Sequence, residues 1–600
     1  MRHTESKDIR AVPEIERPVP SPGRGARFGS DALAETLRDL DIPFIALTPG
    51  ASFRGLHDSI VNHLGNERPK LLLCLHEEHA VAIAHGWAKV TGRPMAAAVH
   101  ANVGLMHATM AVFNAWCDRV PVLVIGATGP VDAARRRPWI DWIHTARDQG
   151  ALLRGYVKWD DQPASVEAAR ESLLRATWLA ATAPMAPVYV NLDAGLQEAP
   201  LEDALPPLDP ARYRPQASTA PPLNLLARTA HALRQATRPV ILAGRLSRDG
   251  AAWGRRVALA ETLGARVITD LKLGAAFPTD HPLHAGSPGI YLVPEALDAL
   301  RTADAVLSLD WVDLAGTLKT AFGTAPPPQV IQASLDHVLH NGWSMDHQGF
   351  PPVDIHLAAD PDAVVAALLA AIGPPDRPLA AAAAIAEPAS TAPAADGPIS
   401  VDAMACALHA ATAGRDVSLL HLPLSWNGSA WAFRHPLDFL GSDGGGGVGA
   451  GPGLAVGAAL ALRETGRLPI AVMGDGDFLM GATALWTAVH YRIALLIVIA
   501  NNGSFFNDEV HQERVARMRG RQVTNKWIGQ RMADPEIDLA GIARAQGADA
   551  FGPVTQTDML EAVFAEAVAA TSEGRTVVVD VRVAPGYTPA MTAGLTRTAS

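Results

Sequence analysis

The sequence has few charged residues, few cysteines and no long apolar run. Charged residues make up only 18% of the 600 residues, the formal net charge is −11, and no strongly basic helix or arm occurs, so nucleic-acid binding is disfavoured. The cysteines, Cys74, Cys117 and Cys406, lie far apart in apolar settings, which predicts buried packing residues and not a disulfide framework or a zinc site. The N-terminus lacks the apolar core of a signal peptide, and no run approaches the ~18 apolar residues of a membrane span. We therefore expect a cytoplasmic protein with no membrane association.

What the chain does have is length and apolar content. Hydrophobic residues make up 48% of the sequence, and 600 residues predict several domains with large cores. Proline-rich stretches and an Ala/Pro segment of low complexity divide the chain. The expected parts are a loose N-terminal arm (1–27), a first domain (28–198), a proline-containing linker (199–222), a second domain (223–372), an Ala/Pro linker (373–397), a third domain (398–586) and a tail (587–600).

Short apolar runs alternate with helical patterns along these domains. The runs that predict strands are 44–47, 70–75, 95–99, 120–125 and 188–192 in the first domain, and 239–243, 266–269, 305–309 and 329–331 in the second. Helical patterns lie between them, for example at 78–89. This layout predicts an α/β protein of three doubly wound domains with mainly parallel sheets.

The third domain holds the most informative motif. Gly474-Asp475-Gly476 follows the apolar run 468–473, and Asn502 follows the apolar run 495–500, so both side chains are expected at the carboxyl ends of neighbouring parallel strands. A carboxylate and an amide oxygen suit Mg²⁺, a hard cation that completes its shell with phosphate oxygens. The glycines let backbone N–H groups approach a diphosphate. Ordinary strand-end turns are the alternative, because Gly, Asp and Asn are common turn residues.

This motif resembles the signature of thiamine-diphosphate (ThDP) enzymes, which anchors Mg²⁺ and the cofactor diphosphate. The resemblance implies that Asp475 and Asn502 are side-chain ligands of the metal and that Ser504 gives its backbone carbonyl. It also implies that Asp477 lies beside the diphosphate. Members of the family have three α/β domains, so the resemblance, which covers roughly 28–586, implies a pyrimidine-binding, a central and a diphosphate-binding domain in that order.

In this family a carboxyl group of the first domain activates the aminopyrimidine ring of the cofactor. The activating glutamate lies nine residues before the glycine of a G-[YW]-A pattern, and Gly86-Trp87-Ala88 follows Glu77 at that spacing. The resemblance therefore implies that Glu77, and not Glu78, is the catalytic, cofactor-binding acid, for which a raised pKa is favourable. A purely local role stays open, because acids are common at helix starts.

A glycine-rich loop before the helix at 454–462 is the third feature of the family pattern. Four consecutive glycines at 444–447 permit close backbone approach to a ligand. The resemblance implies that Gly446 and Gly447 wrap the cofactor rings and that Val448 props the cofactor in its bent shape. In the family the first and third domains meet between two subunits, which implies a homodimer or homotetramer with active sites at the subunit interface.

The segment after residue 99 resembles that of the benzoylformate decarboxylases. Their active-site histidine precedes a glycine by four residues and an Asn-Ala-Trp by fourteen, and His100, Gly104 and Asn114 keep both spacings. The resemblance implies that His100 is a catalytic proton relay. His107 is expected only to line the channel, and His76 to be a polar residue at a helix start.

Other segments resemble the acetolactate synthases. Benzoylformate decarboxylases have a pocket serine directly after an N-terminal Pro-Gly, whereas Pro49-Gly50 is followed by Ala51 and then Ser52. The stretch 139–145 is also of the acetolactate synthase kind. The contact that holds a substrate carboxylate is therefore open.

Together these patterns favour a ThDP- and Mg²⁺-dependent enzyme that decarboxylates a small-molecule 2-oxo acid and then releases an aldehyde or ligates the product to a second carbonyl. The alternative is an acetolactate-synthase-like carboligase with FAD in the central domain, for which the turn at 244–246 is the only hint. A CoA-thioester lyase ranks lower, because the stretch 584–600 has one Arg and no Lys. A non-catalytic relative is disfavoured by the presence of Glu77, Asp475 and Asn502.

Overall fold

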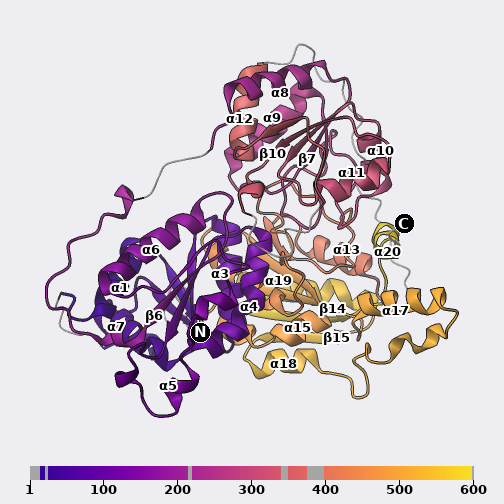
Figure 1. Cartoon of the computed structure of the whole chain (residues 1–600). Helices are drawn as coiled ribbons and strands as arrows, with labels where there is room; N and C mark the ends of the chain where they lie inside the picture. Colours follow the sequence, from indigo (N-terminus) through magenta and orange to yellow (C-terminus); the bar gives the residue numbers. More distant parts are fainter. Residues whose placement is uncertain (1–13, 20–24, 214–218, 340–348, 374–397, 597–600) are drawn as a thin grey trace, which may run out of the picture.

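The computed structural model describes residues 14–19, 25–213, 219–339, 349–373 and 398–596. Much of the expected arm (1–13 and 20–24), nearly all of the expected Ala/Pro linker (374–397) and the end of the tail (597–600) lie outside the described residues. The described residues form three parallel sheets, each built from its own stretch of the chain and packed among helices (Figure 1). This arrangement confirms the predicted α/β class with mainly parallel sheets.

The first sheet has the strand order β2-β1-β3-β4-β6-β5. Its strands are β1 (Phe44–Leu47), β2 (Lys70–Leu73), β3 (Met95–Val99), β4 (Val122–Thr128), β5 (Asp160–Asp161) and β6 (Val188–Asp193). The helices of this region are α1 (Gly29–Asp39), α2 (Arg54–Asp58), α3 (Glu77–Thr91), α4 (Ala101–Asp118), α5 (Ile140–Ile143), α6 (Val166–Ala181) and α7 (Ala194–Glu198). Strands β3 and β4 are buried along their whole length, as expected for parallel strands with helices on both faces.

The central sheet has the order β11-β10-β9-β7-β8. Its strands are β7 (Pro239–Ala243), β8 (Arg266–Ile268), β9 (Ala305–Leu309), β10 (Gln329–Ala333) and β11 (Ile355–Leu357). The helices are α8 (Leu223–Gln235), α9 (Gly250–Leu263), α10 (Pro294–Arg301), α11 (Leu314–Phe322) and α12 (Pro361–Ile372). In Figure 1 this part stands above the other two.

The third sheet has the order β12-β13-β14-β16-β15. Its strands are β12 (Val417–His421), β13 (Leu468–Gly474), β14 (Leu495–Asn501), β15 (Asp549–Val554) and β16 (Thr576–Arg582). The helices are α13 (Val401–Ala411), α14 (Ala450–Leu462), α15 (Asp475–Gly481), α16 (Ala484–His490), α17 (Phe506–Met518), α18 (Leu539–Ala545), α19 (Leu560–Ser572) and α20 (Pro589–Thr596). Because β13 and β14 are adjacent and parallel, their carboxyl ends meet at one edge of the sheet.

Several predicted elements differ from those observed. Strand β4 begins after Pro121, because proline has no N–H to give to the sheet. Strands β5 and β11 are too short to leave an alternating pattern and were not predicted. Between β13 and β14 the chain forms two helices, α15 and α16, which are divided near Gly481, where an added Cβ would lie 2.3 Å from the carbonyl oxygen of Gly449.

Helices α3 and α14 join the first and third parts of the chain. A Cβ on Gly86 would lie 2.1 Å from the carbonyl oxygen of Leu454, and one on Gly457 would lie 1.9 Å from that of Ile83. The two backbones therefore touch at positions where only glycine fits. This contact fixes the start of α3 relative to the glycine-rich loop that precedes α14.

Part of the expected N-terminal arm is held in place. Residues Glu14–Glu16 form a short 3-10 helix, and the Glu16 carboxylate lies 3.0 Å from His490 Nε2 and 3.4 Å from the Tyr491 hydroxyl. Cys74 is buried as expected, whereas Cys117 and Cys406 are only half-buried. Within the described part of the chain, no helix combines the length and the apolarity that crossing a membrane requires.

Candidate active site

The carboxyl edge of the third sheet brings the predicted metal ligands together. Asp475 is buried, and its Oδ1 and Oδ2 atoms accept hydrogen bonds from the Gly476 N–H (2.9 Å) and the Gly503 N–H (2.6 Å). Burial raises the pKa of the Asp475 carboxyl, and these backbone donors lower it. Asn502 Oδ1 accepts from the Ser504 N–H at 3.0 Å. The three predicted ligands thus lie at the ends of the adjacent strands β13 and β14, and the Gly503 N–H joins the two segments through Asp475.

This edge fits a small hard cation. A carboxylate oxygen, an amide oxygen and backbone carbonyls are the donors that Mg²⁺ accepts. The Ser504 hydroxyl is turned inward, donating to the buried Glu509 carboxylate, so its backbone carbonyl is the group left to act as a ligand. Nothing lies within 4 Å of a Cβ added to Gly474, which leaves room beside Asp475 for a ligand.

Asp477 anchors the start of α14. Its Oδ1 accepts from the Gly449 N–H at 2.6 Å and the Gly451 N–H at 3.3 Å, and His421 Nε2 lies 3.7 Å from its Oδ2. The carboxylate therefore neutralises the amino end of this helix. Its predicted place beside a diphosphate stays a prediction.

The glycine-rich loop packs against α4. A Cβ on Gly445 would lie 2.4 Å from Asn114 Oδ1, and one on Gly447 would lie 2.5 Å from Met110 Cε. Gly446 has a φ of +73° and open space where its side chain would be, and the neighbouring Val448 is 45% exposed. The loop backbone therefore packs closely against α4, and the predicted contact of Val448 with the cofactor stays a prediction.

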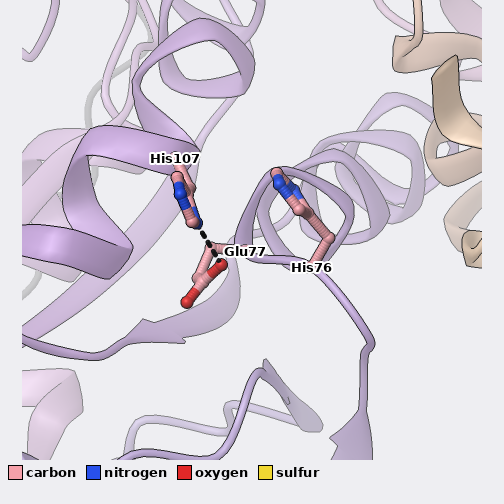
Figure 2. Close-up of side chains that lie close together, drawn as sticks. All are labelled: His76, Glu77 and His107. Carbon is pink, nitrogen blue, oxygen red and sulfur yellow. Dashed lines mark hydrogen bonds and ion pairs between the residues drawn. The ribbon is translucent and has the colours of Figure 1, made fainter.

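Glu77 opens α3 and faces α4. Its Oε2 lies 3.0 Å from His107 Nδ1 (Figure 2). A Cβ on Gly104 would lie only 3.1 Å from Glu77 Oε1. His76 caps the helix by accepting the Glu78 N–H at its Nδ1 (3.1 Å). Gly104 therefore matters for the space that it leaves to the Glu77 carboxylate.

His100 lies between the end of β3 and the start of α4. Its Nδ1 is 2.8 Å from Ser52 Oγ, and its ring meets the His144 ring edge-on at 4.6 Å. Burial and the neighbouring His144 lower the pKa of His100, so the imidazole is neutral near pH 7. Ser52 is buried against this ring, and the contact that holds a substrate carboxylate stays open.

Three family models match the chain in order. They are the thiamine pyrophosphate enzyme N-terminal TPP-binding domain over residues 27–152, the central domain over 226–368 and the C-terminal TPP-binding domain over 424–581. The chain belongs to the ThDP-dependent decarboxylase and acetolactate synthase superfamily. It is an enzyme of this kind with domains that bind ThDP.

Individual relatives of this superfamily member come from both branches. Benzoylformate decarboxylase of Pseudomonas aeruginosa is 26% identical over 515 residues, which cover 84% of this chain and 90% of the relative. Acetolactate synthase of Mycobacterium bovis is 25% identical over 494 residues, covering 79% and 76%. The crystal structure of benzoylformate decarboxylase from Polynucleobacter necessarius has the same fold, with a TM-score of 0.77, 21% identity and coverage of 94% and 100%.

Glu77, the predicted activating acid, lies beside two histidines. Ligand atoms of His76, Glu77 and His107 lie within 4.8 Å of one another, which raises the question of a metal site. His76 Nδ1 accepts the Glu78 N–H, however, so the proton of its neutral ring is on Nε2 and that nitrogen cannot bind a metal. In the cluster, Glu77 is therefore hydrogen-bonded to His107, and the His76 ring stacks on the His107 ring at 5.0 Å. Sequence spacing missed it, although His107 follows Gly104 by three residues on the same helix face.

Glu78, the next residue of α3, lies near Asp477. Burial and the nearby Asp477 raise the pKa of its carboxyl. The next residue, His79, reaches Thr483 with an Nε2–Oγ1 distance of 2.8 Å. A raised pKa was expected of the activating acid, so Glu78 is the natural control for Glu77.

Proposed function

We propose that this chain is a ThDP- and Mg²⁺-dependent enzyme that decarboxylates a 2-oxo acid and releases an aldehyde or ligates the product to a second carbonyl. The observation that carries the proposal is His100, a neutral imidazole held at a strand end of the first domain. The likeness to benzoylformate decarboxylase of Pseudomonas aeruginosa also supports decarboxylation.

Each residue has a separate task in this proposal. Bound ThDP would supply the electron sink for cleavage of the carbon–carbon bond to the carboxylate. Asp475, Asn502 and the Ser504 carbonyl would hold Mg²⁺, and the glycine-rich loop with Val448 would orient the cofactor. Glu77 would hold a proton at its carboxyl against the cofactor ring. His100 would deliver a proton to the substrate carbon.

A panel of 2-oxo acids tests the proposal. The protein is incubated with ThDP and Mg²⁺, and CO₂, aldehyde and hydroxyketone products are quantified for each acid. We expect CO₂ release that needs both cofactors, with aldehyde as the main product of an aryl or branched acid. No turnover of any acid by protein that binds ThDP would refute the proposal.

The second candidate is a carboligase with FAD in the central domain. A cavity of about 540 Å³ lies beside Gly244 between the first and central parts of the chain, and the half-buried side chains of Arg245 and Arg248 line it. The likeness to acetolactate synthase of Mycobacterium bovis supports this candidate. A yellow purified protein that makes acetolactate from pyruvate would favour it over the decarboxylase.

A further inference from the structure

Residues 50–52 of the first domain pack closely against the His100 ring. A Cβ on Gly50 would lie 2.3 Å from His100 Cβ and 2.4 Å from its Cγ, so the backbone of this turn lies flush against the ring. Ser52, two residues on, is 3% exposed and contacts the Nδ1 side of the ring. The ring is therefore held on one face and at one nitrogen.

The hydrogen bonds of Ser52 leave its hydroxyl proton available to His100. Its Oγ accepts the Ala101 N–H at 3.2 Å, so the hydroxyl hydrogen is free to point at His100 Nδ1, 2.8 Å away. The backbone N–H of Ser52 also points at Nδ1, at 3.4 Å. Two donors at Nδ1 require a lone pair there, and a neutral imidazole then carries its proton on Nε2.

The surroundings of Ser52 keep this geometry rigid. The Ser52 carbonyl accepts from Gln197 Nε2 at 3.0 Å, and Gln197 is itself fully buried. Ala101 has a φ of +47°, a backbone conformation that residues other than glycine rarely adopt. Strained backbone of this kind persists where its surroundings hold it, and it is concentrated at functional sites.

We propose that Ser52 is a positioning residue that fixes His100 as the Nε2–H tautomer, so that the ring acts as an acid toward the substrate. The inference rests on the proposed decarboxylation. After the bond to the carboxylate breaks and CO₂ leaves, the retained electron pair takes the proton from His100 Nε2 to form the C–H bond of the aldehyde. The imidazolate left behind takes a proton from water, and the hydroxide so formed combines with the released CO₂ to give bicarbonate. Loss of this acid leaves more time for a second carbonyl to react.

The first test reads the tautomer itself and needs no activity. Histidine labelled with ¹⁵N is observed by long-range ¹H–¹⁵N correlation, and His100 is assigned by the signals lost in His100→Gln. We expect an unprotonated Nδ1 in the wild type and a mixture of tautomers in Ser52→Ala. Ser52→Cys, which fills the same space with a weak donor, should behave in the same way.

Ser59→Ala is the matched control. Ser59 is also a buried serine of the first domain, but its hydroxyl donates to Asp31 at 2.7 Å and does not contact His100. The control should leave the His100 signals as in the wild type. An unchanged tautomer in both Ser52 variants, or an equal change in Ser59→Ala, would overturn the proposal.

The second test measures the pH profile of the wild type and of both Ser52 variants. A hydroxyl that donates to Nδ1 stabilises the neutral ring, so its removal moves the acidic limb of kcat to higher pH. The charged or titratable groups facing His100 are His144, Glu77 and Arg137, and all three are kept in the variants. We also expect kcat roughly fivefold to tenfold lower and a larger share of ligation product. If no 2-oxo acid is turned over, the proposed function fails while the tautomer test still decides this inference.

Discussion

His79 is a buried base at the contact between the first and third parts of the chain. Burial and the neighbouring His76 lower its pKa to about 4, from 6.5 for an unperturbed histidine. The unfolded chain takes up a proton at this residue below pH 6.5, whereas the folded chain does so only near pH 4. The folded state therefore loses stability as the pH falls through this window, and His79 contributes no pH dependence above it.

Replacing His79 should flatten this acid dependence. Between pH 6.5 and pH 4, the free energy of unfolding of the wild type should fall by roughly 2–4 kcal/mol more than that of His79→Gln. The thermal unfolding midpoint of each protein across this range is the measurement. His57→Gln, which removes an exposed histidine, is the control and should follow the wild type. A His79→Gln protein as acid-sensitive as the wild type would contradict this assignment.

Site residues could be predicted from the sequence where they directly follow recognisable strands. Asp475, Asn502 and Ser504 were expected together because two apolar strands end beside them, and in the structure the Gly503 N–H donates to Asp475 across these two strand ends. The pairing of Glu77 with His107, and of His100 with Ser52, could not be predicted, because each joins residues about 30 to 48 positions apart. No local pattern encodes such contacts, which depend on how helices dock.

At the scale of elements, glycine decides how α3 and α14 meet. Gly457→Ala would drive a methyl group into the backbone carbonyl of Ile83, which cannot move aside as a flexible side chain could. We expect a loss of about 1–3 kcal/mol or more, seen as a lower unfolding midpoint and weaker ThDP binding.

Gly254→Ala is the control for this packing argument. Gly254 lies within helix α9, and nothing stands within 4 Å of its added Cβ. This replacement should be neutral or stabilise by roughly 0.5–1 kcal/mol, because alanine is the better helix former. Equal effects of the two replacements would show that the α3–α14 contact is not the cause.

Strands with continuous apolar runs were the most predictable elements. β1, β3, β7 and β9 have the predicted bounds, because burial on both faces leaves an uninterrupted apolar signal. The division into α15 and α16 could not be read from the same signal. It arises where the backbone of Gly449, distant in sequence, presses against Gly481.

At the scale of the whole molecule, we propose a homodimer or homotetramer whose active sites combine the first domain of one subunit with the third domain of another. Such a site takes Glu77 from one chain and Asp475 from its partner. Co-expressed Glu77→Gln and Asp475→Ala chains would then form mixed dimers with one intact site. Purified mixtures should regain about a quarter of wild-type activity, since half of the dimers are mixed and half of their sites intact.

A site built within one chain predicts the opposite result. Every chain in the mixture would carry one defect, and no activity would return. The mass of the protein in solution, from light scattering, must also exceed that of one 63.1 kDa chain. Activity absent from mixtures that contain verified mixed dimers would contradict the shared site.

The most direct test of the central claim is CO₂ release by Glu77→Gln beside Glu78→Gln, each with ThDP, Mg²⁺ and the preferred 2-oxo acid. The two glutamates are neighbours, yet Glu77 faces His107 and Glu78 lies near Asp477. The account predicts that Glu77→Gln lowers turnover by about a hundredfold or more and that Glu78→Gln keeps most of it. Full turnover by Glu77→Gln, or collapse only in Glu78→Gln, would contradict the account.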